Sequence, residues 1–464
     1  GFISGLHSPE FEQPLVALAD LVFSKQDNAE AINSWLLRYG GDYVAFMREK
    51  DTGRWACLND VLARLPIYYH RRNGLTCISR EIRVTTDFAG VCDMDSTGMA
   101  QYLLFGYPLG KKTILEGVDR LPPATLLTGD RAGKGHSLRP LFQFNFDEKR
   151  SPRRFEEEAQ NLSEIFIDAC VKIKRSAPDS TPVLSLSGGL DSRTVAGGLI
   201  RAGIDFRGVT YEDADKTAKG DVIYASEIAD KLHISWQKIH LPAPLGKDII
   251  RLFNLTGGMN SASMAFYIPF LEAIKNRYEQ NILYLTGDGG DKTLPRMPPP
   301  LHFTSTDALT RYLINRHYLM PIETAAALLG LGVKDLYQSV YNRISEYPEE
   351  NIRNRYVHFM IYERGMKWLF EGEDRNRCFL PSATPFYDLE FFSNAMSCPE
   401  RYKKNHRLYS ALLKNLSPEA AGIVDMNRMA PVISHRYRQI ETALSFLSRY
   451  PGISRRTKSR LSPP

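Results

Sequence analysis

The segment PVLSLSGGLDSRTVAGGLIRAG at residues 182–203 constrains the fold of this chain more than any other part of it. The mainly apolar residues at 183–186 predict a short buried strand, and the pattern at 193–202 predicts the helix that follows it. Only the six residues SGGLDS, at 187–192, connect the two. A strand that turns this sharply into a helix is typical of an α/β fold with a parallel sheet, in which ligands bind at the carboxyl ends of the strands.

The composition of this connecting loop is typical of an anion site. Gly188 and Gly189 have no Cβ, so the backbone can turn sharply and successive N–H groups can converge on one anion. The start of the helix also favours phosphate through its positive dipole end. Asp191 would repel phosphate unless a divalent cation lay between them, so the loop predicts a site for magnesium and pyrophosphate. The same residue types also form ordinary turns, and the loop alone leaves that alternative open.

A second loop, TGDGGDK at 286–292, follows a predicted strand at 281–286 in the same way. It places glycines beside Asp288 and Asp291, and carboxylates are ligands that Mg²⁺ prefers. If the two strands are neighbours in the sheet, Asp191 and Asp291 can lie close together. The alternative is an acidic surface turn.

The order of predicted elements indicates two domains, at 1–140 and 150–464. Alternating runs around turns at 51–53 and 73–74 predict antiparallel hairpins in the first. A charged helix is expected over 153–174. Strands and helices then alternate from 182 to about 290, which predicts a doubly wound parallel sheet, and the chain is mainly helical from 304 onward.

Composition is that of a soluble globular protein, with 43% hydrophobic and 24% charged residues among 464. No stretch has the length of a membrane span, and six scattered cysteines indicate reduced thiols, so we expect a cytoplasmic protein without a membrane partner. The net charge of +6 is mild, and the basic run at 454–460 is typical of a solvated terminus. No RNA-binding module is recognisable, and a nucleic-acid partner is not expected.

Several further segments share their order and spacing with one family. GDYVAF at 41–46, ND and LPIYY at 59–69, SREI at 79–82 and PFYD at 385–388 accompany the two loops. Together they resemble the asparagine synthetase family, over residues 41 to about 416. The resemblance implies an N-terminal domain similar to class II glutamine amidotransferases and a C-terminal synthetase domain of the ATP pyrophosphatase type.

The resemblance also implies roles for individual residues, with ATP and Mg²⁺ as the nucleotide and the metal. Asp288 stands where these synthetases carry a glutamate near the reacting amine, and Lys292 replaces an acid and could meet phosphate. The residues implied in nucleotide and metal binding are Ser187, Gly188, Gly189 and Ser192 at the pyrophosphate, Thr286 and Gly287 in the second loop, Asp191 and Asp291 at Mg²⁺, and Leu186 and Val209 beside the adenine. For the two apolar strand residues a purely structural core role is an equal alternative.

The implied reaction converts a small-molecule or peptide carboxylate to an acyl-adenylate with release of pyrophosphate, and an amine then forms an amide. The amine would be ammonia, a glutamine-derived nitrogen or an amine of the substrate itself. Homodimers are usual in the family.

The positions that depart from the family pattern are those implied around the substrate, whereas the ATP loop matches the family. Pro381 and Ala383 replace a glutamate and an arginine, and Ser410 aligns with a lysine for which Arg407 or Lys414 could substitute. The chain opens GFIS, so a glutaminase cysteine would lie upstream of Gly1, and no residue here is assigned to glutamine hydrolysis. His7 near the start is expected at the surface.

These departures leave three hypotheses. The first is an asparagine synthetase-like ligase that joins separate substrates. The second is an intramolecular ligase of the β-lactam synthetase or lasso-peptide cyclase type. The third is a nucleotide-binding scaffold without activity.

Overall fold

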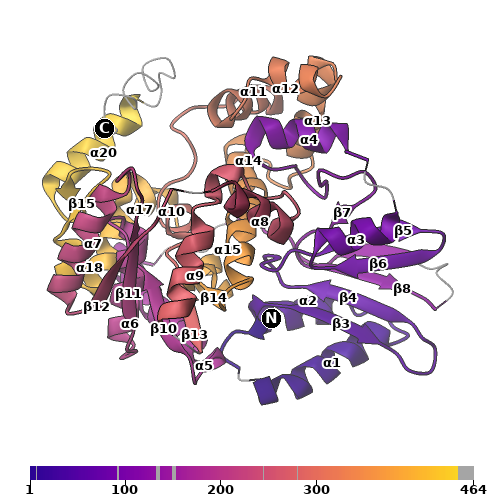
Figure 1. The fold of residues 1–464 in the computed structure, drawn as a ribbon, viewed down its shortest axis with the longest axis horizontal. Coiled ribbons are helices and arrows are strands. Elements are labelled where there is room, and N and C mark those ends of the chain that lie inside the picture. Colours follow the sequence, from indigo (N-terminus) through magenta and orange to yellow (C-terminus); the bar gives the residue numbers. More distant parts are fainter. Residues whose placement is uncertain are drawn as a thin grey trace.

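A computed structural model describes residues 1–6, 8–90, 93–131, 136–148, 153–243, 245–278 and 281–447. Its centre is a five-stranded sheet in which every pair of neighbours is parallel, with its strands seen edge to edge in Figure 1. In spatial order the strands are β12 (Ser235–His240), β11 (Arg207–Glu212), β10 (Thr181–Ser185), β13 (Ile282–Leu285) and β14 (Ser382–Ala383). The predicted parallel sheet is therefore confirmed.

The strand order reverses direction between β10 and β13. From β10 the chain adds β11 and then β12 on one side, and it returns to the other side of β10 with β13. Val183 lies opposite Tyr284, and Leu184 lies opposite Leu285. In an open parallel sheet such a reversal leaves a crevice beyond the strand ends, where ligands bind. The two predicted loops follow the two strands that border this crevice.

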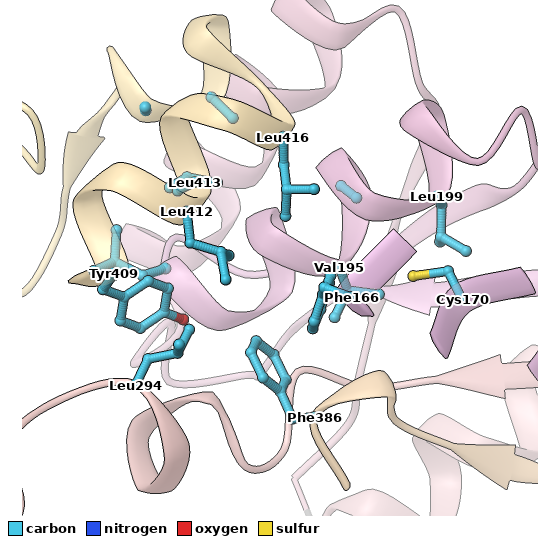
Figure 2. Packing of buried hydrophobic residues seen from close by; sticks show 14 of the residues in the cluster. Phe166, Cys170, Val195, Leu199, Leu294, Phe386, Tyr409, Leu412, Leu413 and Leu416 are labelled. Atoms are coloured by element: carbon cyan, nitrogen blue, oxygen red, sulfur yellow. The ribbon is translucent and has the colours of Figure 1, made fainter. Parts of the chain in front are cut away.

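Helices cover both faces of the sheet, and this explains why its central strands are apolar along their length. All four residues of β13 are buried, as expected for a parallel strand covered on both sides. On one face α5 (Phe155–Ser176), α6 (Leu190–Arg201) and α18 (Arg407–Leu416) share a core that includes Phe166, Val195 and Leu412, and Figure 2 shows this packing. On the other face α9 (Tyr267–Arg277) packs on β10 and β13.

The N-terminal part contains two antiparallel sheets. Both predicted hairpins are confirmed, since β3 pairs with β4 and β5 pairs with β6. One sheet consists of β3 (Val44–Arg48), β4 (Trp55–Asn59), β8 (Thr125–Gly129) and β9 (His136–Pro140), and the other of β6 (Leu75–Ser79), β5 (Tyr68–Arg72) and β7 (Asp119–Arg120).

The predicted hairpins are not the whole of this part, because four helices of the described residues also lie in it. They are α1 (Glu12–Phe23), α2 (Ala29–Arg38), α3 (Ile82–Ala89) and α4 (Ser96–Phe105). The first three begin without a side-chain cap hydrogen bond, and only α2 follows a residue type common at helix starts, Asn28. Burial of residues such as Leu18 and Trp35 stabilises them instead.

The remaining elements are mostly helices that follow β10, as the sequence predicts for the C-terminal part. They are β1 (Phe2–Ile3), β2 (Gly41–Asp42), α7 (Lys219–Leu232), α8 (Gly246–Thr256), α10 (Gly290–Thr293), α11 (Thr306–His317), α12 (Ile322–Leu328), α13 (Val333–Ser345), α14 (Ile352–His358), the π-helix η3 (Phe359–Leu369), α15 (Phe370–Arg377), α16 (Leu389–Ser397), α17 (Glu400–Lys403), α19 (Pro418–Ala421), β15 (Val424–Asp425), β16 (Ala430–Pro431) and α20 (His435–Leu447), with short 3₁₀ turns η1 (Ser8–Phe11), η2 (Ala262–Met264), η4 (Pro385–Tyr387) and η5 (Lys404–His406).

Residues on both sides of the predicted boundary at 140–150 share buried cores. Leu104 and Phe105 of α4 pack with Leu313, Val340 and Phe359 from the C-terminal helices. The two predicted domains are therefore in extensive contact, and the division of the chain between them stays a prediction.

Arg64 is the most deeply buried polar link between these parts. Its side chain is 1% exposed, its Nε lies 3.3 Å from Asp42, and it forms an ion pair with Glu373 of α15. Its guanidinium also lies over the rings of Phe370 and Tyr387, at 4.1 and 4.7 Å from their centroids. One arginine thus joins the N-terminal sheet region to the helix that lines the site described below.

None of the helices in the described ranges is long and apolar enough to span a bilayer. The described cysteines, at 57, 77, 170, 378 and 398, are free thiols. Cys92, His7 and the basic run at 454–460 lie outside the described residues.

We predict that Arg64→Met destabilises the protein by about 3 kcal/mol, because the buried Asp42 and Glu373 must then share Arg377, which pairs with both. The measurement is urea unfolding at neutral pH. Arg54→Met is the matched control, since Arg54 pairs with Glu49 at the surface and exposed pairs contribute little. Equal midpoints for the two variants would contradict the prediction.

Candidate functional site

A cavity of about 270 Å³ opens at the carboxyl ends of β10, β11 and β13. The loops after these strands form one wall, and residues of the 259–267 segment and of η3 and α15 form the other. The cavity therefore occupies the crevice that the strand order creates.

The first loop is held in shape by its own side chains. The Ser187 N–H donates to Ser192 Oγ at 3.0 Å, and the Gly189 N–H donates to Ser187 Oγ at 3.3 Å. Helix α6 begins at Leu190, three residues earlier than predicted, so Asp191 and Ser192 belong to its first turn. Their N–H groups point out of the helix end, where anions are favoured.

Asp221, at the start of α7, occupies part of the predicted anion site. Its Oδ1 accepts a hydrogen bond from the Gly188 N–H at 2.9 Å, and its side chain lines the cavity. Burial raises the pKa of Asp221, and the hydrogen bond from Gly188 lowers it. A phosphate group bound at Gly188 would have to replace this carboxylate.

Arg193 stabilises the conformation of the same loop through hydrogen bonds to its carbonyl groups. It is fully buried and donates to the carbonyls of Gly188 at 2.7 Å and Gly189 at 3.1 Å. It also donates to Ile423 O at 3.0 Å and to Val424 O at 3.1 Å. The loop is thereby tied to the C-terminal segment, a contact that the sequence did not reveal.

The second loop lies directly against the first. A Cβ on Gly287 would be 2.6 Å from the Ser192 nitrogen, and a Cβ on Gly290 would be 2.5 Å from Asp191 Oδ1. Both distances are too short for any side chain. The two glycines therefore allow the close approach of the loops that the sequence predicted for neighbouring strands.

Three carboxylates gather where the loops meet. Burial, followed by the charge of Asp291, raises the pKa of Asp191 to about 7, while a hydrogen bond from Tyr409 lowers it. Burial, followed by the charges of Glu373 and Asp291, raises the pKa of Asp288 to about 6. A bound cation would relieve this repulsion.

The donor chemistry fits Mg²⁺ only in part. Carboxylate oxygens are suitable ligands, and Asp291 is close enough to Asp191 for its charge to raise the pKa of Asp191. Among the described residues, however, no cluster of three or more His, Cys, Asp or Glu side chains is arranged to hold a metal. A magnesium ion here would need oxygens from a ligand such as a phosphate chain.

The structure places most, but not all, of the predicted residues at the cavity. Those that line it are Leu186, Ser187, Asp191, Ser192, Thr286, Gly287 and Asp288. Val209, predicted beside the adenine, is instead fully buried in the core against α9, and its neighbour Thr210 lines the cavity. Gly188 and Gly189 lie in the loop beside it.

Lys292, predicted to meet phosphate, is a buried residue paired with its neighbour Asp291. Its side chain is 8% exposed and forms an ion pair with Asp291, whose own side chain is 57% exposed. Neither residue is among those that line the cavity.

Arg375 is the buried cation of the cavity. It donates to Asn376 Oδ1 at 2.8 Å and to Asn260 Oδ1 at 3.2 Å, and it lies over the Tyr267 ring at 4.3 Å from the centroid. No carboxylate of the described chain forms an ion pair with it, so its charge is open to an anionic ligand. The sequence contained only a weak signal, the DR pair at 374–375, and none for Asn260 or Tyr267.

Helix α18 contributes Tyr409 to the site. Tyr409 directly precedes Ser410, the position at which the family resemblance implies a lysine. The Tyr409 hydroxyl donates to Asp191 Oδ1. The suggested substitutes for the missing lysine lie elsewhere, since Arg407 stacks on Phe155 at 3.8 Å and Lys414 is exposed. Neither lines the cavity.

Neither a protein-family model nor a curated protein matches this sequence. Among solved structures, NMN synthetase from Francisella tularensis is 18% identical, over 46% of this chain and 95% of that chain, with a TM-score of 0.24. Glutamine-dependent NAD+ synthetase from Acinetobacter baumannii is 12% identical, over 76% and 83%, with a TM-score of 0.24. A U34-tRNA thiolase from Methanococcus maripaludis is 14% identical, over 64% and 80%, with a TM-score of 0.24. At such values we base no statement about function on these structures.

We predict that Gly287→Ala destabilises the protein by roughly 1–3 kcal/mol, because its methyl group would overlap the Asp191–Ser192 backbone. Thermal unfolding measures the effect. Gly246→Ala is the control, since a Cβ there meets nothing within 4 Å. A G287A variant that melts together with the control would show that the loops are not in this contact.

We predict that Asp191→Asn stabilises the metal-free protein at pH 8 by roughly 1–3 kcal/mol, and that this gain shrinks toward pH 4. The folded-state pKa of Asp191, about 7, is raised above its ordinary value. The folded protein therefore binds the proton more tightly than the unfolded chain, and stability contributed by this group is lost as pH rises from about 4 to 7. Urea unfolding at several pH values with EDTA tests this, with exposed Asp230→Asn as the control. A gain that does not change with pH would contradict it.

Proposed function

We propose that this chain is an ATP-dependent ligase that adenylates a carboxylate and transfers the acyl group to an amine. The observation that supports this most is the meeting of the two loops at the reversal of strand order. There, Asp191 and Asp288 face one cavity beside the N-terminus of α6. We therefore expect a phosphate chain, a cation and a proton acceptor to meet within this single crevice.

In this proposal the phosphates of ATP lie at the Ser187–Ser192 loop and displace the Asp221 carboxylate from Gly188. Asp191 and Asp291 would hold Mg²⁺, which when bound neutralises charge on the departing pyrophosphate. Arg375 would receive an anionic oxygen of the substrate or of AMP, because it lacks a carboxylate partner in the described chain.

The proposed reaction has two steps. A substrate carboxylate oxygen attacks the α-phosphorus, and the bond to the β-phosphate bridging oxygen breaks, which gives acyl-AMP and pyrophosphate. The amine nitrogen then attacks the acyl carbon, and the bond to AMP breaks. Asp288 would accept the proton that the amine loses, since its pKa of about 6 makes it a stronger base than an ordinary aspartate.

One feature favours the second candidate, a ligase that closes a ring within one substrate. The cavity wall opposite the loops includes Met259, Met264, Trp368 and Leu369. Apolar and aromatic side chains there suit a carboxylate with an apolar body better than free aspartate. Both candidate ligases begin with the same adenylation step, and they differ in the class of substrate.

We predict that the protein releases pyrophosphate from Mg·ATP in the presence of its carboxylate substrate, and that Asp191→Asn lowers the rate at least about a hundredfold through lost charge stabilisation. A coupled pyrophosphate assay checks this with aspartate, with other amino acids and with amino-terminated carboxylates that can cyclise. Asp230→Asn, on the exposed face of α7, is the matched control.

The outcome identifies the candidate. Release with aspartate and ammonia supports the intermolecular ligase, and release only with a cyclising substrate supports the ring-forming one. Binding of Mg·ATP without release from any of these substrates would favour a scaffold and contradict the proposed activity.

A further inference from the structure

A second cavity, of about 460 Å³, lies between the 109–123 segment and helices α13 and η3. It shares no lining residue with the first cavity. The π-helix η3 separates the two: Met366 and Lys367 line the second cavity, and Trp368 and Leu369 line the first.

Lys367 is the unusual residue of the second cavity. Its side chain is only 6% exposed, yet it lines the cavity. Its Nζ makes no hydrogen bond and no ion pair with the described residues. A buried ammonium without an acceptor is costly, so the cavity contains a lysine whose charged form is not stabilised by a partner in its own walls.

The two acids whose charges act on Lys367, Glu363 and Glu371, already accept hydrogen bonds from other donors. Glu363 accepts from Arg343 Nε at 2.6 Å, from the Gly110 N–H at 2.9 Å and from the Tyr347 hydroxyl at 3.2 Å. Glu371 accepts from Arg120 and, at 2.9 Å, from the Tyr68 hydroxyl. Burial, followed by the charge of Arg120, lowers the pKa of Lys367 to about 7 despite these acids. An anion at Nζ would favour the charged form of this lysine, so we expect an anion and a proton to be taken up together near neutral pH.

The rest of the wall defines what kind of anion fits. The other cations there already have partners. Arg120 pairs with Glu371, and Arg343 pairs with Glu346, an acid of the same wall, at 2.8 Å. Lys111 pairs with Asp119 at 2.8 Å, and Lys112 pairs with Asp95 at 2.5 Å. Much of the remaining surface is apolar, from Leu109, Leu121, Pro122, Pro123 and Met366. A highly charged phosphate compound would leave this surface unused, whereas one charge on an apolar body matches it.

We propose that this cavity binds a small organic carboxylate with an apolar body, whose carboxylate pairs with Lys367 Nζ. The site is separate from the proposed adenylation site, and its test needs no enzymatic activity.

Hexanoate is the probe, and isothermal titration calorimetry at pH 7 is the measurement. We expect hexanoate to bind the wild-type protein with 1:1 stoichiometry, and its neutral analogue hexanamide to bind at least about tenfold more weakly, because a charge-assisted hydrogen bond is lost. Lys367→Met should weaken hexanoate binding by a similar factor. Lys111→Met is the matched control, since it removes a paired lysine from the same wall and should leave the affinity unchanged.

Thermal unfolding of K367M establishes that the variant is folded, and Leu121→Trp, which fills the cavity while keeping Lys367, gives a second route to the same loss of binding. Hexanoate binding that is equal in wild type and K367M would overturn the proposal, because the ion would then bind elsewhere, for example at Arg375. Equal affinity for hexanoate and hexanamide, or no binding of hexanoate by the wild type, would also overturn it.

Discussion

The parallel pairing of β10 with β13 is the constraint on which the site depends. Because these strands are adjacent and run in the same direction, the loops that follow them emerge at one edge of the sheet. Strand order adds a second condition, since the chain moves away from β10 on one side and returns on the other. The glycines at 287 and 290 then allow the loops to touch. A different strand order would separate the two loops.

The contact of the loops gathers more negative charge than the protein itself compensates. The charge of Asp291 contributes to the raised pKa of both Asp191 and Asp288, and Tyr409 holds Asp191 in place with a neutral hydrogen bond. Arg375 lies across the cavity but pairs with amides rather than with these carboxylates. A site in which anions and an unpaired cation face the same space is suited to a ligand that has charges of both signs, such as a metal–nucleotide complex.

The N-terminal part contributes to the site without lining it. Arg64 binds Glu373, and Tyr68 and Arg120 bind Glu371, so three residues of that part hold two positions of α15. The same helix carries Arg375 toward the first cavity, and η3 before it separates the two cavities. Buried ion pairs of this kind fix orientation more than they add stability. The β-rich part therefore acts as a support for the wall opposite the loops.

The local units can be predicted from the sequence alone: the strand–loop–helix at 182–203, its counterpart at 281–292 and the hairpins of the N-terminal part. These depend on residues close together in the chain, where periodicity and glycine placement carry the information. Three features could not be predicted from the sequence. The Tyr409 hydroxyl donates to Asp191, the Asp221 carboxylate accepts from the Gly188 N–H, and Val209 lies in the core while Thr210 faces the cavity. The first two contacts join positions 218 and 33 residues apart, and the third depends on which face of β11 meets α9. Long-range packing sets all three, and no local pattern records it.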